Sequence, residues 1–222
     1  MTHRTVIRLC SSTLLAALVF GCGKDTPSST SGPFLVVTPS FKGLVEGSTQ
    51  QFAATLSETD VPVTWVSSNT AVATVSATGV VTAVGAGTAA ATATMVSDPT
   101  QTRSASITVT SPPTLVSGTN VTGVSGTGDR GTQKLFKIIV PAGATSLSIV
   151  LSGGTGDVDL YLQQGTPPGI VSYDLTTSTC ASENGGTGEN CTIANPVPGT
   201  WFVMLALWDP YAGVTITPKI LP

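Results

Sequence analysis

Two aspartates, Asp157 and Asp159, stand two positions apart in a stretch where apolar and polar residues alternate. If this stretch is a strand, both carboxylates point to the same face of the sheet. Paired carboxylates suit Ca²⁺, which prefers six to eight oxygen ligands, and Asp129, Asp174 and nearby carbonyls are candidates for the remaining positions. Calcium is therefore the one cofactor that the sequence suggests, with these four residues as its candidate ligands.

The two aspartates also have a structural interpretation, which we favour. Asp157 follows Gly156 and would fix a turn, while Asp159 would accept hydrogen bonds from loop amides. Catalysis is the third alternative, and glycoside hydrolysis would require two carboxylates about 5–10 Å apart with a raised pKa on one of them. The sequence offers no apolar pocket that would raise this pKa, so we expect no catalytic residue and no enzyme.

Histidine and basic residues are scarce. The one histidine is His3, so a chain that loses its N-terminus cannot form a Ser-His-Asp triad, a Cys-His pair or a histidine-ligated metal site. Charged residues make up 9% of the chain, with 9 Lys and Arg against 12 Asp and Glu. The sequence contains no basic cluster, which excludes a nucleic-acid partner.

Aromatic residues are the next candidates, because exposed rings stack on sugars and anchor protein interfaces. Trp208 and Tyr211 stand in Trp-Asp-Pro-Tyr, which is expected to form a loop or hairpin tip. With Tyr161 and Tyr173 they are our candidate binding patch. Trp201 is instead expected to lie in a core, since its neighbour Phe202 would face the other way on a strand.

The first 21 residues have the pattern of an export signal, in which two arginines precede an apolar run too short to span a bilayer. The run ends in Val-Phe-Gly-Cys (19–22), which resembles the lipobox of bacterial lipoproteins. This resemblance implies a lipid on Cys22 and a membrane anchor, and the Gly after Cys22, where an Asp would favour the inner membrane, suggests the outer membrane. Residues 22–33 are expected to be a flexible tether. An ordinary secretory signal is the alternative.

Cys180 and Cys191 are the cysteines that remain after Cys10 in the leader and Cys22 at the anchor. An even pair in an exported chain favours a disulfide. The segment between them has a single apolar residue, Ala181, and would be held in place by the bond. A metal pair is the alternative, but no CxxC motif supports it.

Residues 34–110 contain seven short apolar or alternating segments separated by turn residues, which is typical of a β-sandwich. Trp65 is expected to fill its core. An Ala-Thr segment at 88–96 has helix-forming alanines, but its alternation favours a strand. The stretch resembles the bacterial immunoglobulin-like group 2 family through Trp65, Ser67–Asn69, Val72–Val75, Gly79–Ala83 and Ala86–Thr88.

A Pro-Pro linker at 111–113 precedes a second region, residues 114–222. Six strands are expected there, at 135–141, 146–153, 158–165, 190–196, 200–207 and 213–220, after a turn-rich segment at 118–131. The region resembles the bacterial pre-peptidase C-terminal family in Val140–Gly143, Ser152–Tyr161, Ser172–Asp174, Glu189–Cys191, Pro198–Leu205 and Tyr211–Ile216. This resemblance implies a jelly-roll-like β-sandwich.

The sequence thus predicts an all-β protein of two β-sandwiches in tandem behind a lipoprotein signal. We expect a non-enzymatic surface lipoprotein that binds an extracellular polysaccharide or protein, with the first sandwich as a spacer. One alternative is an accessory or structural envelope protein associated with a secreted peptidase or hydrolase. Another is a histidine-free hydrolase built on the paired carboxylates Asp157 and Asp159.

Overall fold

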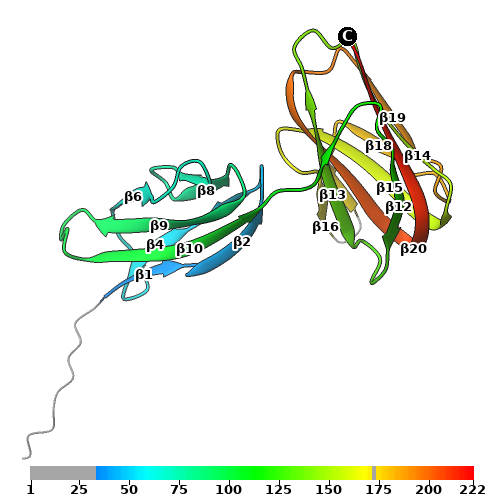
Figure 1. Cartoon of the computed structure of the whole chain (residues 1–222). Helices are drawn as coiled ribbons and strands as arrows, with labels where there is room; N and C mark the ends of the chain where they lie inside the picture. The colour runs from blue at the N-terminus through cyan, green and yellow to red at the C-terminus, as the bar shows by residue number, and fades with distance from the viewer. Residues whose placement is uncertain (1–33, 172–173) are drawn as a thin grey trace, which may run out of the picture. The chain divides into compact units, whose positions relative to one another are not determined.

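The computed structural model describes residues 34–171 and 174–222, and Figure 1 shows that they form two β domains. The predicted leader, Cys22, the tether and Tyr173 lie outside these residues. Within the described ranges, no helix is long and apolar enough to cross a membrane.

The first domain contains ten strands in three sheets, with the orders β1-β4-β5, β2-β10-β9-β6 and β3-β8-β7. Their bounds are β1 (Leu35–Thr38), β2 (Phe41–Val45), β3 (Thr49–Gln51), β4 (Ala53–Leu56), β5 (Thr59–Asp60), β6 (Val63–Ser67), β7 (Ala73–Val75), β8 (Val80–Ala83), β9 (Gly87–Met95) and β10 (Thr102–Thr110).

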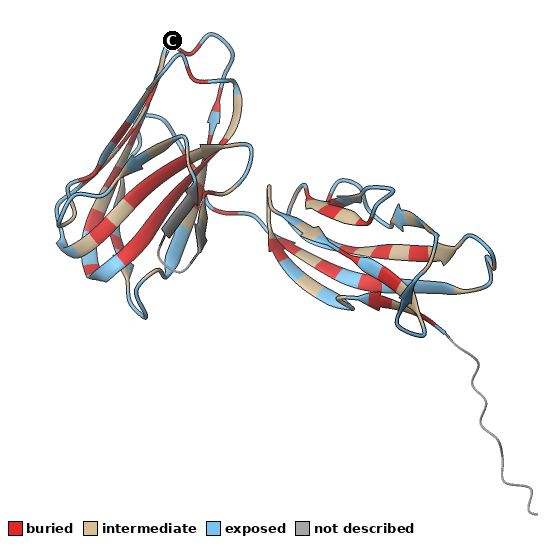
Figure 2. Cartoon of the chain, turned by 180° about the vertical axis from the view of Figure 1, so that it is seen from behind, coloured by how far each residue is buried: buried red, intermediate tan, exposed pale blue. Residues whose placement is uncertain are grey.

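The core of the first domain follows from the period-two alternation of its strands. Three alternate residues are buried in each of β9 and β10, and the buried stripes are visible in Figure 2. Phe52 and Ile107 are among the largest fully buried side chains. Trp65 is only half-buried and packs against this core from one side, so the expectation that it fills the core is met in part.

Two local predictions for the first domain have clear outcomes. The Ala-Thr segment is a strand, β9, which pairs with β6 and β10 and buries its alternating alanines in the core. Strand β2 was not expected from the sequence. It begins with an exposed Phe41 and contains Gly43, so it lacks the apolar alternation of a half-buried strand, yet it pairs parallel to β10.

The second domain is a sandwich whose two layers share one long strand. The strands are β11 (Thr114–Leu115), β12 (Val121–Gly126), β13 (Gln133–Val140), β14 (Ser146–Ser152), β15 (Thr155–Gln164), β16 (Gly169–Val171), β17 (Asp174–Thr177), β18 (Cys180–Ser182), β19 (Asn190–Ala194) and β20 (Gly199–Leu221).

Strand β20 corrects the prediction of two strands joined by a tip at Trp208–Tyr211. Its first half pairs with β13 and β15, and its second half pairs with β12 and β14, so the strand passes from one layer into the other (Figure 1). The segment 118–131, expected to be turns, contributes β12 to the second layer. Trp201, Val203 and Leu205 point into the core between the layers, as predicted for Trp201.

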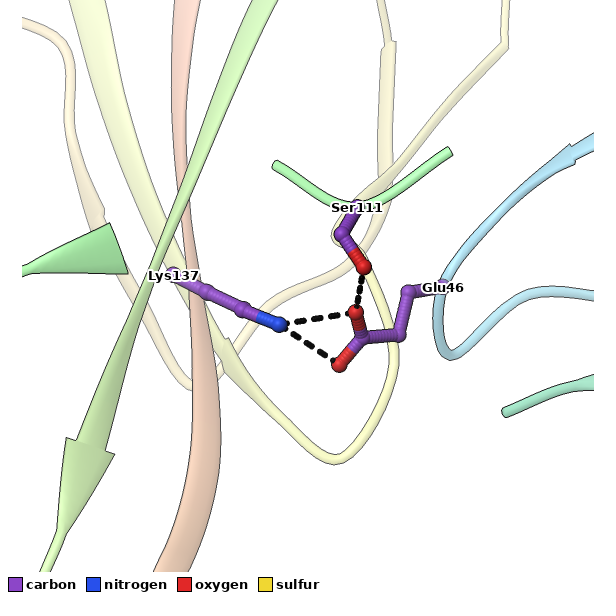
Figure 3. Close-up of polar contacts among 3 residues, drawn as sticks. All are labelled: Glu46, Ser111 and Lys137. Atoms are coloured by element: carbon purple, nitrogen blue, oxygen red, sulfur yellow. Dashed lines mark hydrogen bonds and ion pairs between the residues drawn. The ribbon is translucent and has the colours of Figure 1, made fainter. Parts of the chain in front are cut away.

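An ion pair joins residues of the two domains (Figure 3). Lys137 on β13 donates from Nζ to both carboxylate oxygens of Glu46, at 2.9 and 2.7 Å, and the hydroxyl of Ser111 donates to the same carboxylate. Burial raises the pKa of Glu46, but these hydrogen bonds and the charge of Lys137 outweigh it and hold the pKa below its usual value.

Candidate functional site

An acidic and aromatic pocket of about 320 Å³ lies in the second domain, and we call it the acidic pocket. It is open to solvent and lies at the small end of the range for ligand sites. Strand β15, the loop after β18 and strand β20 supply its walls. The lining residues are Asp157, Asp159, Tyr161, Glu183, Asn184, Gly185 and Trp208.

Strand β15 places three of these side chains together because they are two residues apart. Asp157, Asp159 and Tyr161 share one face, while Val158 and Leu160 are fully buried in the core on the other. The shared face predicted for the two aspartates is therefore observed. The ring of Tyr161 packs against Met204 and Ala206 of β20, which leaves its hydroxyl to reach the pocket.

Trp208 reaches the pocket at an irregularity in the pairing of β15 with β20. Asp157 pairs with Asp209 and Val158 pairs with Leu207, so Trp208 has no partner on β15. An extra residue of this kind redirects its side chain and is often found beside functional sites. Trp208 is 45% exposed. The guanidinium of Arg130 lies over the ring, 2.6 Å from its centroid.

The loop between the two cysteines is held against β15. Cys180 and Cys191 form the predicted disulfide. Asp157 accepts a hydrogen bond from the backbone N–H of Gly186 at 2.9 Å, and the N–H of Val158 donates to the Gly186 carbonyl at 3.0 Å. These bonds bring Glu183, Asn184 and Gly185 to the pocket. Asp157 thus lies in a strand and accepts from a loop amide, the role predicted for Asp159, instead of fixing a turn.

Glu189 fixes the same loop from inside the domain. Its side chain is 1% exposed, and Oε2 accepts hydrogen bonds from the hydroxyl of Ser182 and from the backbone and side-chain nitrogens of Asn184. Its other oxygen, Oε1, is buried without a partner in the described part of the chain. Glu189 therefore determines where Asn184 lies on the pocket wall.

The electrostatics of the pocket centre on Asp159. Burial is the largest cause that raises its pKa to about 6, and the negative charges of Glu183 and Asp157 raise it further. The hydroxyl of Tyr161 donates to Glu183 at 2.8 Å and lies 3.4 Å from Asp159. Burial and the hydrogen bond to Glu183 raise the pKa of Tyr161, so this hydroxyl stays a donor.

The structure divides the predicted site residues into three groups. Asp157, Asp159, Tyr161 and Trp208 meet at the acidic pocket, but Asp129 does not line it, and the side chain of Asp174 is not described. Tyr211 contradicts the predicted patch: it is 3% exposed and packs in the core, since β20 continues through it and brings it against Gly126. Tyr173 lies outside the described residues.

A calcium site at the four aspartates stays a prediction. Among the described residues, no group of three or more Asp, Glu, His or Cys is placed to hold a metal ion. Sequence reasoning also missed Glu183, Asn184 and Glu189. The sequence pattern that could have indicated them is the polar loop between the two cysteines. The position of this loop beside β15 depends on tertiary contacts, which the sequence pattern does not give.

A second hollow, of about 440 Å³, is apolar and lies beside β11 and the end of β20. Leu115, Ile138, Ile139 and Ile220 are among its walls, and its only polar side chains are those of Thr114 and Ser117. With no charged group to orient a ligand, it is a weaker candidate than the smaller acidic pocket.

Two family models match this chain. Residues 34–109 match the bacterial Ig-like domain (group 2), and residues 132–206 match the bacterial pre-peptidase C-terminal domain. The predicted family resemblances and the all-β fold of two tandem sandwiches are confirmed. Both families are non-catalytic modules, so neither matched stretch is an enzyme.

Curated relatives are bacterial proteases. A zinc metalloprotease of Helicobacter pylori is 36% identical over 102 residues, which is 46% of this chain and 37% of the relative. A hemagglutinin/proteinase of Vibrio cholerae is also 36% identical over 102 residues, covering 46% of this chain and 15% of the relative. An extracellular protease of Xanthomonas campestris is 34% identical over 103 residues, covering 46% of this chain and 16% of the relative. The chain thus spans well under half the length of these relatives.

Similar solved structures include the pre-peptidase C-terminal domain of a collagenase from Bacillus anthracis. Its TM-score is 0.33 at 12% identity, covering 49% of this chain and 94% of that domain. A periplasmic inhibitor of g-type lysozyme from Aeromonas hydrophila has a TM-score of 0.35 at 7% identity, covering 49% of this chain and 95% of the inhibitor.

Proposed function

We propose that this chain, in which a bacterial Ig-like domain (group 2) precedes a bacterial pre-peptidase C-terminal domain, is a non-enzymatic binding module of the cell envelope. The acidic pocket is the recognition site, and its ligand is an extracellular protein or polysaccharide. One observation carries this proposal: a partly exposed tryptophan stands beside a cluster of carboxylates in a hollow of ligand size. The Ig-like domain serves as a spacer.

Binding is tested with the full chain and an immobilised panel of envelope and matrix proteins and polysaccharides. Trp208→Ala removes the aromatic wall and is expected to weaken capture of the recognised member about tenfold or more, because a central aromatic contact carries much of a binding energy. Ile139→Ala is the matched control, since Ile139 is 52% exposed and lines the apolar hollow instead. Loss of binding in Ile139→Ala alone would move the site to that hollow, and no capture by the unmodified chain would end the proposal.

The anchor is part of the same proposal. A lipid on Cys22 would hold the protein on the outer membrane with both domains outside the cytoplasm. The lipobox-like Val-Phe-Gly-Cys supports the anchor, and the extracellular protease among the relatives supports an extracytoplasmic location. Cys22→Ala should abolish incorporation of radiolabelled fatty acid and release the chain from the membrane fraction. An unchanged membrane fraction would contradict the anchor.

A second candidate function is that of an accessory protein to a secreted protease, and the protease relatives favour it. In that case the recognised protein is the protease itself or its substrate. Copurification of a protease with the chain from the native envelope, lost in Trp208→Ala, would support this role. Capture of a polysaccharide with no associated protease would favour the first candidate.

A further inference from the structure

The acidic pocket presents negative charge from more than one element. Asp157 and Asp159 come from β15, and Glu183 comes from the loop after β18. Glu183, Asp157 and Glu189 each raise the pKa of Asp159. Arg130 lines a small adjoining hollow together with Asp159 and Trp208. No Lys, Arg or His stands among the described residues that line the pocket. With three carboxylates in its walls and one arginine beside it, the hollow has a net negative charge, which attracts a cation.

The side-chain donors of Tyr161 and Asn184 in the pocket are already engaged. The Tyr161 hydroxyl donates to Glu183, and the side-chain nitrogen of Asn184 donates to Glu189 and to Ser182. Apart from the indole N–H of Trp208 and the amide oxygen of Asn184, the polar side-chain atoms that remain on the walls are carboxylate oxygens, which accept hydrogen bonds and cannot donate them when ionised. Sugar hydroxyls both donate and accept, whereas ammonium and guanidinium groups only donate. The wall therefore suits a cationic group better than a neutral sugar.

The aromatic wall gives an independent indication of the same chemistry. Trp208 already has a guanidinium, that of Arg130, stacked over its ring, although Arg130 does not line the acidic pocket. Tryptophan is the aromatic side chain that attracts cations most strongly. A cationic group in the hollow would meet carboxylates and would still lie beside this ring.

Building on the proposed function, we infer that the acidic pocket binds a lysine or arginine side chain of a partner protein. Its carboxylates accept the N–H donors of the cation, and the Trp208 ring contacts the aliphatic stem or the guanidinium plane. The recognised segment of the partner is therefore basic and exposed.

The experiment measures binding of short peptides to the full chain by calorimetry at low salt. The probes are Gly-Gly-Arg-Gly-Gly, its lysine counterpart and its citrulline counterpart, which keeps the shape of arginine and lacks its charge. The arginine or lysine peptide is expected to bind at least about tenfold more tightly than the citrulline peptide. Asp159→Asn should weaken that binding about tenfold, because it removes one charge and keeps the size of the side chain.

Asp209→Asn is the matched control, since Asp209 is an exposed neighbour of Trp208 that does not line the pocket and the variant has the same net charge. Binding in Asp209→Asn should stay within about twofold of the unmodified chain. The inference is overturned if citrulline binds as well as arginine, if Asp209→Asn weakens binding as much as Asp159→Asn, or if Ca²⁺ or a neutral oligosaccharide alone binds the pocket. If a neutral oligosaccharide binds and Trp208→Ala abolishes that binding, the inference fails but the proposed binding function stands. If the chain binds no panel member and no peptide, both the inference and the proposed function fail.

Discussion

Asp159 connects the shape of the acidic pocket to its proton chemistry. Its pKa of about 6 results first from burial and then from the charges of Glu183 and Asp157. A carboxyl group whose pKa is higher in the folded than in the unfolded chain binds more protons when folded. Its favourable contribution to the free energy of unfolding is complete below the unfolded pKa, near 4, and is lost as the pH rises through about 6.

The first prediction concerns this residue. Asp159→Asn should raise the melting temperature at pH 7.5, where the native carboxylate is ionised beside two others, and should change it little at pH 4. Thermal unfolding of both proteins across pH 4 to 8 measures the difference. Asp209→Asn is the control for loss of an exposed carboxylate, and an equal gain at both pH values would contradict the explanation.

The second prediction concerns Glu189. Glu189→Ala leaves the backbone and side-chain nitrogens of Asn184 without their acceptor, and we expect a loss of about 2–3 kcal/mol in the free energy of unfolding. Urea denaturation measures it. Glu58→Ala removes an exposed glutamate and should change stability by less than about 0.5 kcal/mol. A similar small change in Glu189→Ala would show that the buried carboxylate does not fix the loop.

At the scale of elements, strands β15 and β20 produce the pocket by the way they fit together. Their pairing is irregular around Asp157, and this irregularity directs Trp208 towards the carboxylates. Gly154 and Gly156 allow the close approach, because a side chain at either position would meet the backbone of β20 between Pro210 and Val214. Both glycines also have positive φ angles, of 80° and 94°, which other residues rarely adopt.

The third prediction tests this close approach. Gly156→Ala places a Cβ against the backbone carbonyl of Pro210 and strains a φ of 94°, so we expect a loss of at least about 2 kcal/mol and an altered Trp208 fluorescence. Gly185→Ala is the matched control, since a Cβ there meets nothing within 4 Å. Equal stability of the two variants would mean that β20 can shift without cost.

At the scale of the whole molecule, each domain has its own core, and the ion pair of Glu46 with Lys137 links residues of the two. Glu46 and Lys137 are about 15% exposed at the side chain, so solvent screens their attraction in part. The pKa of Glu46 is lowered, and the favourable contribution of the pair is therefore present above the ordinary value of 4.5 and is lost as the pH falls through the lowered pKa.

The fourth prediction is a double-mutant cycle of Glu46→Gln and Lys137→Met. We expect a coupling energy of about 0.5–1 kcal/mol at pH 7, because the pair is close but only partly buried. Urea denaturation at pH 7 and pH 3 measures it, and the coupling should shrink at the lower pH. A coupling energy of zero at pH 7 would show that the contact adds nothing to stability.

The sequence by itself determined the all-β class, the two domains, the burial of Trp201 and the pairing of Cys180 with Cys191. These features depend on alternation along one strand, on turn residues between strands and on cysteine chemistry, all of which are local or nearly so. It also placed Asp157 and Asp159 on one face of a strand, because side chains two residues apart point the same way.

Only the tertiary structure decided the path of β20 and, with it, the site. Pro210 and the exposed Asp209 have the local character of a turn, but the strand continues because β12, β14 and β15 supply partners on both sides of that point. The same pairing buries Tyr211 and turns Trp208 towards the carboxylates. The position of Glu183 was likewise decided by the disulfide and by hydrogen bonds across the sandwich. The register of these strands and the position of a bulge depend on packing between distant segments. The alternation of residues along one strand does not determine them.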